Sequence, residues 1–353
     1  MGNETRWYTT LEAVKRAMPI TGASLDSNIK ASIEAASAQI ENGTNRRFIP
    51  ETKTAQYGWP TLSLNSWTLL LPEDLIAVTA LTKEGDDVTA IASTDYFLEP
   101  REEGPPYHKI EIDLASTAFY SIKDTHQRQV RVTGRFGHSE NTKTGGTVDG
   151  AGLASDAAAV SFVCSDESLI GVGDTLLIES EAIFVSNKAA AANGSELLDG
   201  ALTQNKAEVS VTVDTGTNFN EGEVILVESE KMLIQSIASN VLTVERAYDG
   251  STLASHANDT AVSVFRTLTI VRGVNGTTAA THADTTAISV YTVPGDISSL
   301  CRAMAISEHI NNRSGWTGSV GTGEGALESR GFNLREFRDG VYRNYRRRQI
   351  GRV

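Results

Sequence analysis

The sequence predicts an α+β protein: a helical core with a β meander, interrupted by an all-β insertion built from two nested repeats. Near both ends of the chain, apolar residues recur at steps of three and four, which indicates amphipathic helices. Between residues 52 and 137 they alternate with polar residues, as in half-buried strands. Two patterns then repeat between residues 158 and 291.

The helix predicted at 25–43 is the element around which the core is expected to pack. Its apolar residues share one helical face, and they are Leu25, Ile29, Ile33, Ala36 and Ile40. Gly43 follows them and is expected to end the helix in a left-handed conformation. A shorter helix is predicted at 9–18, where Thr9 and Glu12 have the spacing of a capping box. One helix cannot bury such a stripe alone, so other segments and neighbouring subunits are expected to cover it.

The predicted core comes in two parts. The first part, 1–137, holds the helical hairpin and the meander, and residues 138–157 are rich in Gly, Ala, Ser, Thr and Asp, which predicts a linker. The second part, 293–353, holds a helix capped by Asp296 and a last helix that ends in a basic arm. Between these two helices, the glycine-rich stretch 315–325 predicts a mobile loop.

Self-comparison of the insertion at 158–292 gives two sets of matches. Residues 173–181 match 222–230 at an offset of 49. Residues 242–246 match 268–272 at an offset of 26. The first halves of both copies therefore come before the two second halves along the chain, which indicates that one copy is nested inside the other.

The simplest parse places one complete unit at 208–266 inside a host copy at 158–187 plus 267–291. Each half alternates Val, Ile and Leu with polar residues, which predicts a small antiparallel β module. The Asp249-Gly250 and Asn275-Gly276 pairs predict equivalent tight turns, because glycine accepts a positive φ. We expect the insertion to be separable from the core, since long insertions cost little closure entropy.

The repeats also duplicate histidines and glutamates. His256 matches His282, and neither has an acid or cysteine at regular metal-ligand spacing, so a repeated structural hydrogen bond is the preferred interpretation. The pairs Glu179/Glu181 and Glu228/Glu230 could bind a cation, although a solvated strand face is preferred for them.

The sequence contains no motif of an enzyme, so we expect no catalytic activity, no cofactor and no metal site. The remaining histidines make no H-E-x-x-H motif, and the glycine-rich stretch 318–325 lacks the Gly-Lys-Ser/Thr of a phosphate-binding loop. Two distant cysteines do not suggest a disulfide framework, and they favour an intracellular origin. No run approaches the ~18 apolar residues of a membrane span, so no membrane partner is expected.

Charge is distributed unevenly along the chain. The formal net charge is −13, which argues against a general nucleic-acid binder. The last segment nevertheless carries eight arginines against two acids, and these arginines are Arg330, Arg335, Arg338, Arg343, Arg346, Arg347, Arg348 and Arg352. A basic tail on an acidic body predicts an arm that docks on an acidic surface or on phosphates, while a solvated helix face remains the alternative.

The order of short motifs in the core resembles the head–tail connector (adaptor) proteins of tailed bacteriophages. The motifs that carry the resemblance are, after the helix at 25–43, Asn45-Arg46-Arg47-Phe48, Tyr57-Gly58-Trp59-Pro60, the strand that ends at Leu71-Pro72, the strand from Ile76 to Leu81, Asp95-Tyr96-Phe97-Leu98, Val130 to Gly137, and Val293-Pro294-Gly295-Asp296-Ile297. The resemblance covers 9–137 and 293–353. The sequence departs from the family pattern where the repeats are inserted, which leaves their role open.

This resemblance implies a structural protein of the virion neck, assembled in the host cytoplasm. Such proteins have a helical connector core and form a ring, commonly of twelve copies, beneath the portal ring. DNA passes through the channel without sequence-specific contacts, and a distal neck or tail protein docks on the other face. The family uses its C-terminal segment to grip the portal, a role that the arginine arm would match here. The alternative function is a host-surface or carbohydrate-binding virion module that uses the β repeats.

Overall fold

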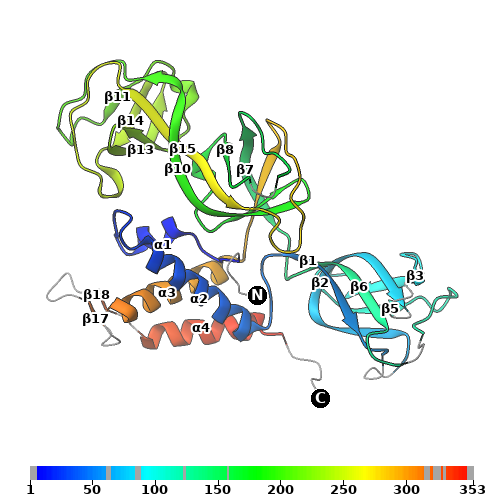
Figure 1. The fold of residues 1–353 in the computed structure, drawn as a ribbon. Helices are drawn as coiled ribbons and strands as arrows, with labels where there is room; N and C mark the ends of the chain where they lie inside the picture. Colours follow the sequence, from blue (N-terminus) through cyan, green and yellow to red (C-terminus); the bar gives the residue numbers. More distant parts are fainter. Residues whose placement is uncertain are drawn as a thin grey trace.

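The computed structural model describes residues 6–60, 65–83, 89–121, 125–156, 159–313, 319–320, 327–328 and 331–347. The protein is mostly β, with 39% strand against 22% helix. Among the described residues, four α-helices form one layer and two large antiparallel sheets form most of the rest (Figure 1). The prediction of an α+β protein with a helical core is therefore wrong. The strands of the ten-stranded sheet in the inserted region alone contain more residues than the four helices.

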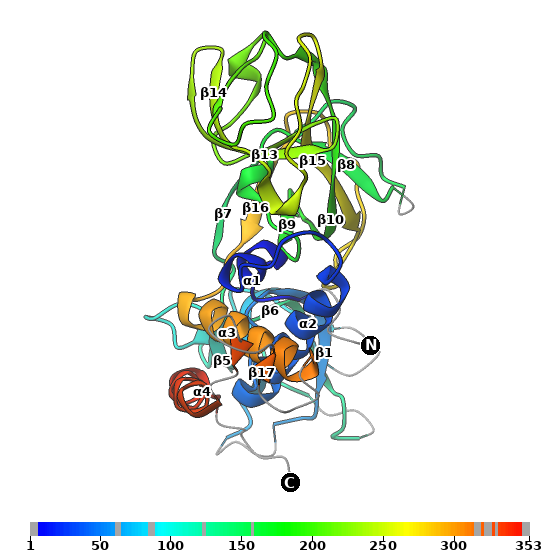
Figure 2. The same cartoon turned by 90° about the vertical axis from the view of Figure 1, so that its left-hand side faces the viewer.

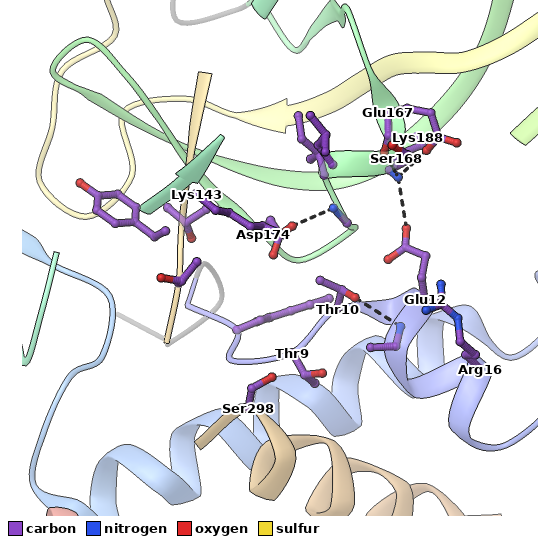
Figure 3. Close-up of a pocket in the computed structure, with 18 of the residues that line it drawn as sticks. Thr9, Thr10, Glu12, Arg16, Lys143, Glu167, Ser168, Asp174, Lys188 and Ser298 are labelled. Atoms are coloured by element: carbon purple, nitrogen blue, oxygen red, sulfur yellow. Dashed lines mark hydrogen bonds and ion pairs between the residues drawn. The ribbon is translucent and has the colours of Figure 1, made fainter. Parts of the chain in front are cut away.

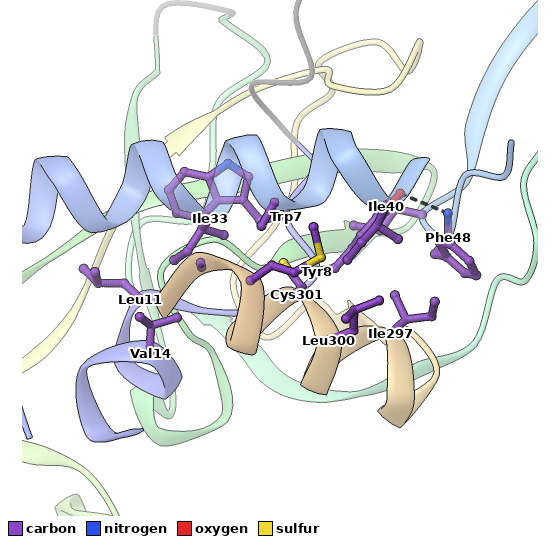
Figure 4. Packing of buried hydrophobic residues seen from close by; sticks show 14 of the residues in the cluster. Trp7, Tyr8, Leu11, Val14, Ile33, Ile40, Phe48, Ile297, Leu300 and Cys301 are labelled. Atoms are coloured by element: carbon purple, nitrogen blue, oxygen red, sulfur yellow. Dashed lines mark hydrogen bonds between the residues drawn. The ribbon is translucent and has the colours of Figure 1, made fainter. Parts of the chain in front are cut away.

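The helical layer is formed by α1 (Leu11–Ala17), α2 (Asp26–Thr44), α3 (Gly295–Arg313) and α4 (Gly331–Tyr345). Trp7 and Tyr8 precede α1 and belong to the core that α1 shares with α2 and α3 (Figure 4). Thr10, rather than the predicted Thr9, caps α1 by accepting a hydrogen bond from the backbone N–H of Ala13. Most of the predicted loop 315–325 lies outside the described residues. Its described part is β17 (Ser319–Val320), which pairs with β18 (Leu327–Glu328).

The apolar stripe of α2 is buried as predicted. Ile29, Ile33 and Ile40 have no exposed surface and Ala36 has 1%, whereas Leu25 is half-buried just before the helix. Full burial of an isoleucine side chain contributes roughly 1.5–3 kcal/mol, so this stripe is a large share of the core energy.

The prediction that Gly43 ends α2 in a left-handed conformation is wrong. Asn45 takes that conformation, with φ 54°, because asparagine tolerates it better than most residues. Gly43 lies within the helix, where a Cβ would come 2.2 Å from the ring of Tyr342 in α4. Gly43 therefore allows α4 to approach α2 closely.

The predicted meander folds as a six-stranded antiparallel sheet with its own core. Its strands are β1 (Glu51–Tyr57), β2 (Thr68–Lys83), β3 (Thr89–Ile91), β4 (Tyr96–Glu99), β5 (Tyr107–Ile112) and β6 (Val130–Phe136). The strand order is β1-β6-β2-β5-β4, and β3 pairs with β2. β2 is long enough to pair with β5 in its first half and with β6 in its second half.

The inserted region forms a ten-stranded antiparallel sheet. Its strands are β7 (Thr142–Asp149), β8 (Ser161–Cys164), β9 (Thr175–Ile178), β10 (Glu181–Leu197), β11 (Ser210–Thr212), β12 (Val224–Val227), β13 (Glu230–Ala238), β14 (Val241–Glu245), β15 (Ala261–Val271) and β16 (Ala287–Tyr291). β7 lies in the predicted linker, 138–157, and pairs with β16 and β8. The predicted linker is therefore largely part of the sheet, because its threonines suit a strand that long-range pairing holds in place.

The sheet is divided between two modules with separate hydrophobic cores, as the nested repeat predicts. The host module is built from β7, β8, β9, the first half of β10, the second half of β15, and β16. The inserted module is built from the second half of β10, β11 to β14 and the first half of β15. Both modules begin earlier than the sequence suggests, because Val148 belongs to the host core and Leu198 to the inserted core.

The pairing register confirms that the modules are copies. The equivalent pairs are Phe184↔Val271 and Val185↔Ile270 in the host module, and Leu233↔Glu245 and Ile234↔Val244 in the inserted module. The continuous strands β10 and β15 run through both modules and join them as a ribbon (Figure 1).

The host module covers the helical layer of the same chain. Val172, Phe184 and Val274 belong to the helical core, and Phe184 stacks edge-on against Trp7 with ring centroids 5.3 Å apart. The expectation that neighbouring subunits are needed to cover the α2 stripe is therefore wrong, since one chain buries it. The insertion is also packed on the core too closely to be a simple appendage.

The two predicted tight turns are among the points at which the modules touch the core. All four turn residues have positive φ, from 49° to 77°. The backbone N–H of Gly22 donates to the carbonyl oxygen of Asp249, and that of Thr52 donates to the carbonyl oxygen of Asn275, both at 2.9 Å. A Cβ on Gly276 would lie 1.9 Å from the carbonyl oxygen of Thr52, so glycine permits this contact.

Candidate functional site

One arginine of the predicted basic arm, Arg347, is buried just after the end of α4. Arg347 is 7% exposed, and its Nη1 donates to Asp74 Oδ1 at 2.6 Å. Its Nη2 donates to the carbonyl oxygen of Leu71 at 2.6 Å, and its backbone N–H caps the carbonyl of Thr44. Arg347 therefore fastens the end of α4 to β2 and α2, and the prediction that it belongs to an exposed docking arm is wrong.

Asp74 is the centre of a buried cluster that joins four elements. Arg46, just after α2, donates to Asp74 Oδ2 at 2.8 Å and to the carbonyl oxygen of Tyr345. The ring of His108 lies 3.6 Å from Asp74, and His138 contacts Arg46. Burial lowers the pKa of both histidines, and the nearby arginines lower it further, so the imidazoles are neutral at pH 7.

The remaining arginines of the predicted arm divide into three groups. Arg335, Arg343 and Arg346 are exposed. Arg338 is half-buried, pairs with Asp339 at 3.0 Å and lies over the ring of Tyr342. The predicted arm residues outside the described part of the chain are Arg330, Arg348 and Arg352.

Sequence reasoning missed Arg46 and Asp74 as partners of the arm. The run Arg46-Arg47-Phe48 was visible as a charged exit from the helix, but Asp74 lies inside an apolar strand 273 positions from Arg347. The one signal in the sequence is the position of Asp74 within a strand of mainly apolar residues, because an acid buried there needs a cation as its partner.

A cleft of about 440 Å³ lies between α1 and the host module (Figure 3). Lys188 donates to the Glu167 carboxylate at 2.6 Å and lies 3.8 Å from the carboxylate of Glu12. Glu12 also accepts the backbone N–H of Val172. Asp174 accepts the backbone N–H of Gly171, and burial raises the pKa of its carboxyl to about 6. These charges satisfy one another across the interface, so the cleft is best understood as the seam that fixes the host module on α1.

The repeated histidines sit in duplicated, buried polar clusters. In the inserted module, His256 contacts Glu228 at 2.7 Å and Glu230 at 3.0 Å, and Glu230 binds Arg246 through both of its oxygens. His282, Glu179, Glu181 and Arg272 repeat this arrangement in the host module. The prediction of a repeated structural hydrogen bond is confirmed.

The interpretation of the glutamate pairs as a solvated face is wrong for their second members. Glu181 and Glu230 are fully buried, whereas Glu179 and Glu228 sit in turns with φ 54° and 53°. Burial raises the pKa of Glu230, but hydrogen bonds from Arg246 and His256 outweigh this effect and lower the pKa to about 2. Glu181 behaves in the same way through Arg272 and the backbone N–H of Ala280, with a pKa of about 2.

The β modules offer few aromatic rings for stacking on sugars. Phe162, Phe184 and Phe219 are each 4% exposed and lie in hydrophobic cores. Within the described ranges, no helix is both long and apolar enough to cross a bilayer. The same residues bring no three His, Cys, Asp or Glu side chains together in a way that could hold a metal ion.

Comparison of the chain with protein-family models, with curated proteins and with solved structures gave no match in any of the three.

Proposed function

We propose that the protein is a structural head–tail connector (adaptor) of a tailed phage, which joins capsid to tail as a ring under the portal. The motif order of 9–137 and 293–353 supports the proposal through its resemblance to that class. The role is one of assembly, with no catalytic step.

The observation that carries the proposal is the division of the molecule into two unlike ends. The inserted module lies at one end, while α4 lies at the other (Figure 2). At the α4 end, Arg335, Arg343 and Arg346 are exposed and Phe337 is 39% exposed. An adaptor needs two different surfaces for two different partners, and arginine with an aromatic neighbour is typical of protein interfaces.

In this proposal the α4 end docks on an acidic surface of the portal. The end that bears the inserted module faces away from the portal and is available to the distal neck or tail protein. Copies of the chain associate into a ring, commonly of twelve copies in this class, around the DNA channel in the virion neck. Arginine forks suit carboxylates because they form paired hydrogen bonds.

Portal association tests the proposal directly. The full chain is mixed with its cognate portal, and assemblies are measured by mass photometry and negative-stain imaging. We expect rings stacked on the portal, and weaker association as salt increases, because exposed charges are screened. The matched variants are a charge-reduced α4, Arg335→Gln with Arg338→Gln, and a control on the opposite end, Lys206→Gln.

Monomers alone in the presence of portal would refute the connector function. Stacked rings that the α4 variants do not weaken would retain the connector function and refute the docking face.

A further inference from the structure

A hollow lies where the C-terminal ends of α2 and α4 meet, beside the exit of the basic arm. Its lining includes Asn42, Asp339, Tyr342, Arg343, Arg346 and Arg347. Gly43 brings the two helices together here, and the hydroxyl of Tyr342 donates to the carbonyl oxygen of Gln39. The walls are therefore held by backbone packing, independently of any ligand.

The charge around this hollow is strongly positive in a chain whose net charge is −13. Arg46 and Arg347 share a single buried acid, Asp74. Burial lowers the pKa of the Arg347 guanidinium, and Arg46 lowers it further against the opposing effect of Asp74. Because two guanidinium groups face one carboxylate, the cluster has an excess positive charge at the base of the hollow.

The arginines at the rim of the hollow are not neutralised either. In the part of the chain that the structure describes, neither Arg343 nor Arg346 makes an ion pair, and both are exposed. Among the described residues of the lining, Asp339 is the one acid, and its carboxylate is occupied by Arg338 at 3.0 Å. A helix C-terminus also attracts cations, but the carbonyls of Thr44 and Tyr345 are already capped by Arg347 and Arg46.

We propose that this hollow binds a phosphate group. The two unpaired guanidinium groups of Arg343 and Arg346 offer more donors than a single carboxylate can accept, whereas a phosphate presents three or four acceptor oxygens. A phosphate monoanion or dianion would also neutralise the excess charge of the cluster.

The source of the phosphate is either the free anion or the backbone of a nucleic acid. The second source rests on the proposed function, because a connector ring surrounds the packaged DNA. The phosphate chemistry itself does not depend on that function, since it follows from the residues of the hollow.

The test compares two variants of the full chain with equal design. Arg343→Gln with Arg346→Gln removes the rim of the hollow, and Arg335→Gln with Lys206→Gln removes two exposed charges outside the lining while leaving the Arg338–Asp339 pair intact. Inorganic phosphate is titrated by calorimetry against the same ionic strength of sodium chloride. We expect the first variant to lose phosphate affinity at least about tenfold, while the second stays within about twofold of the original protein.

Equal losses in the two variants would show bulk electrostatics instead of a site and would overturn the proposal. Absence of phosphate binding in the original protein would overturn it as well. Poly-glutamate and pyrophosphate are also compared as competitors of bound phosphate. If poly-glutamate competes as strongly as pyrophosphate, the hollow is a carboxylate site and the proposal is overturned.

A labelled DNA duplex then distinguishes the two sources. Each phosphate contact contributes about 0.9 to the slope of log affinity against log salt. If nucleic acid is the source, the rim variant should lower the magnitude of this slope by about 1.8. If phosphate binds but the duplex does not, the site stands and its ligand is the free anion. Portal association of the original protein is measured in parallel. If it docks on the portal but binds no phosphate, this inference alone is refuted, and if it binds phosphate but does not dock, only the connector function is refuted.

Discussion

Each copy of the Glu–Arg–His cluster is expected to stabilise the module in which it lies, and substitution of its buried glutamate tests this. Glu230→Gln keeps the shape of the side chain but removes the charge that faces Arg246, whose side chain is fully buried. Glu230 also accepts hydrogen bonds from His256 and from the backbone N–H groups of Ala247 and Ala254. Removing one partner of a buried ion pair costs about 3–5 kcal/mol, so we expect that loss for the inserted module.

A matched control is present in the same cluster. The Glu228 carboxylate contacts the same histidine but its side chain is 61% exposed. An exposed pair contributes about 0–1 kcal/mol, so Glu228→Gln should change the stability by less than 1 kcal/mol. Urea unfolding measures the free energy of unfolding of the two variants. Hydrogen exchange then shows which module has become easier to open.

The equivalent substitution in the host module should have a wider effect. Glu181→Gln disrupts the module that covers Trp7 and the helical layer, so exchange should rise in α2 and α3 as well. Glu230→Gln should leave those helices protected. Losses below 1 kcal/mol for both buried glutamates, or identical exchange patterns, would refute the reasoning.

The same carboxylates predict a pH dependence of stability. Both have a folded pKa of about 2, below the ordinary value of 4.5. Their contribution is therefore complete above pH 4.5 and is lost as the pH falls from 4.5 towards 2. Urea unfolding of the original protein should weaken across this acidic range, and Glu230→Gln should flatten the part of the curve that belongs to the inserted module. A decline confined to pH values above 6 would contradict this assignment.

Three further predictions concern the helical layer. Arg347→Ala should lower the free energy of unfolding in urea by about 2–4 kcal/mol, because it leaves the carbonyl of Leu71 without its donor. The control Arg346→Ala changes an exposed side chain and should stay within about 0.5 kcal/mol of the original protein. Equal effects of the two substitutions would refute the burial of Arg347. Gly43→Ala should expose α4 to proteolysis and cost about 1–3 kcal/mol, because the new methyl meets Tyr342, while Gly340→Ala, with open space around it, should be neutral or stabilising. Joining residue 137 directly to residue 293 should abolish cooperative thermal unfolding, because the helices lose the cover of Phe184 and its neighbours; retained cooperativity would restore the idea of a separable insertion.

The sequence predicted those features that a single periodicity or offset controls. The stripe of Ile29, Ile33 and Ile40 follows helical spacing, and burial acts on that spacing directly. The nested modules follow from two constant offsets, and the equivalent roles of His256 and His282 follow from the same comparison.

The features that the sequence did not predict depend on partners far away in the chain. A run of arginines reads as solvent-exposed, and nothing near Arg347 shows that Asp74 receives it. Gly43 reads as a helix end, although its role is set by Tyr342 in another helix. The strand β7 reads as a linker because its glycines and threonines acquire their structure only by pairing with β16.

The matching registers of the two modules show where the second copy entered the first. In the inserted module, β13 turns directly into β14 at Ser239 and Asn240. In the host module the equivalent strands continue outward instead, and an entire copy takes the place of the two-residue turn. Because the two strands leave side by side, the ends of the guest are already close together and the loop-closure cost is small. The turn at Ser239 and Asn240 is the same kind of junction, left unused. A foreign domain grafted there would also leave from two adjacent strands, but it would have to replace the hydrogen bonds that Asn240 makes with Val213, Asp214 and Gly216.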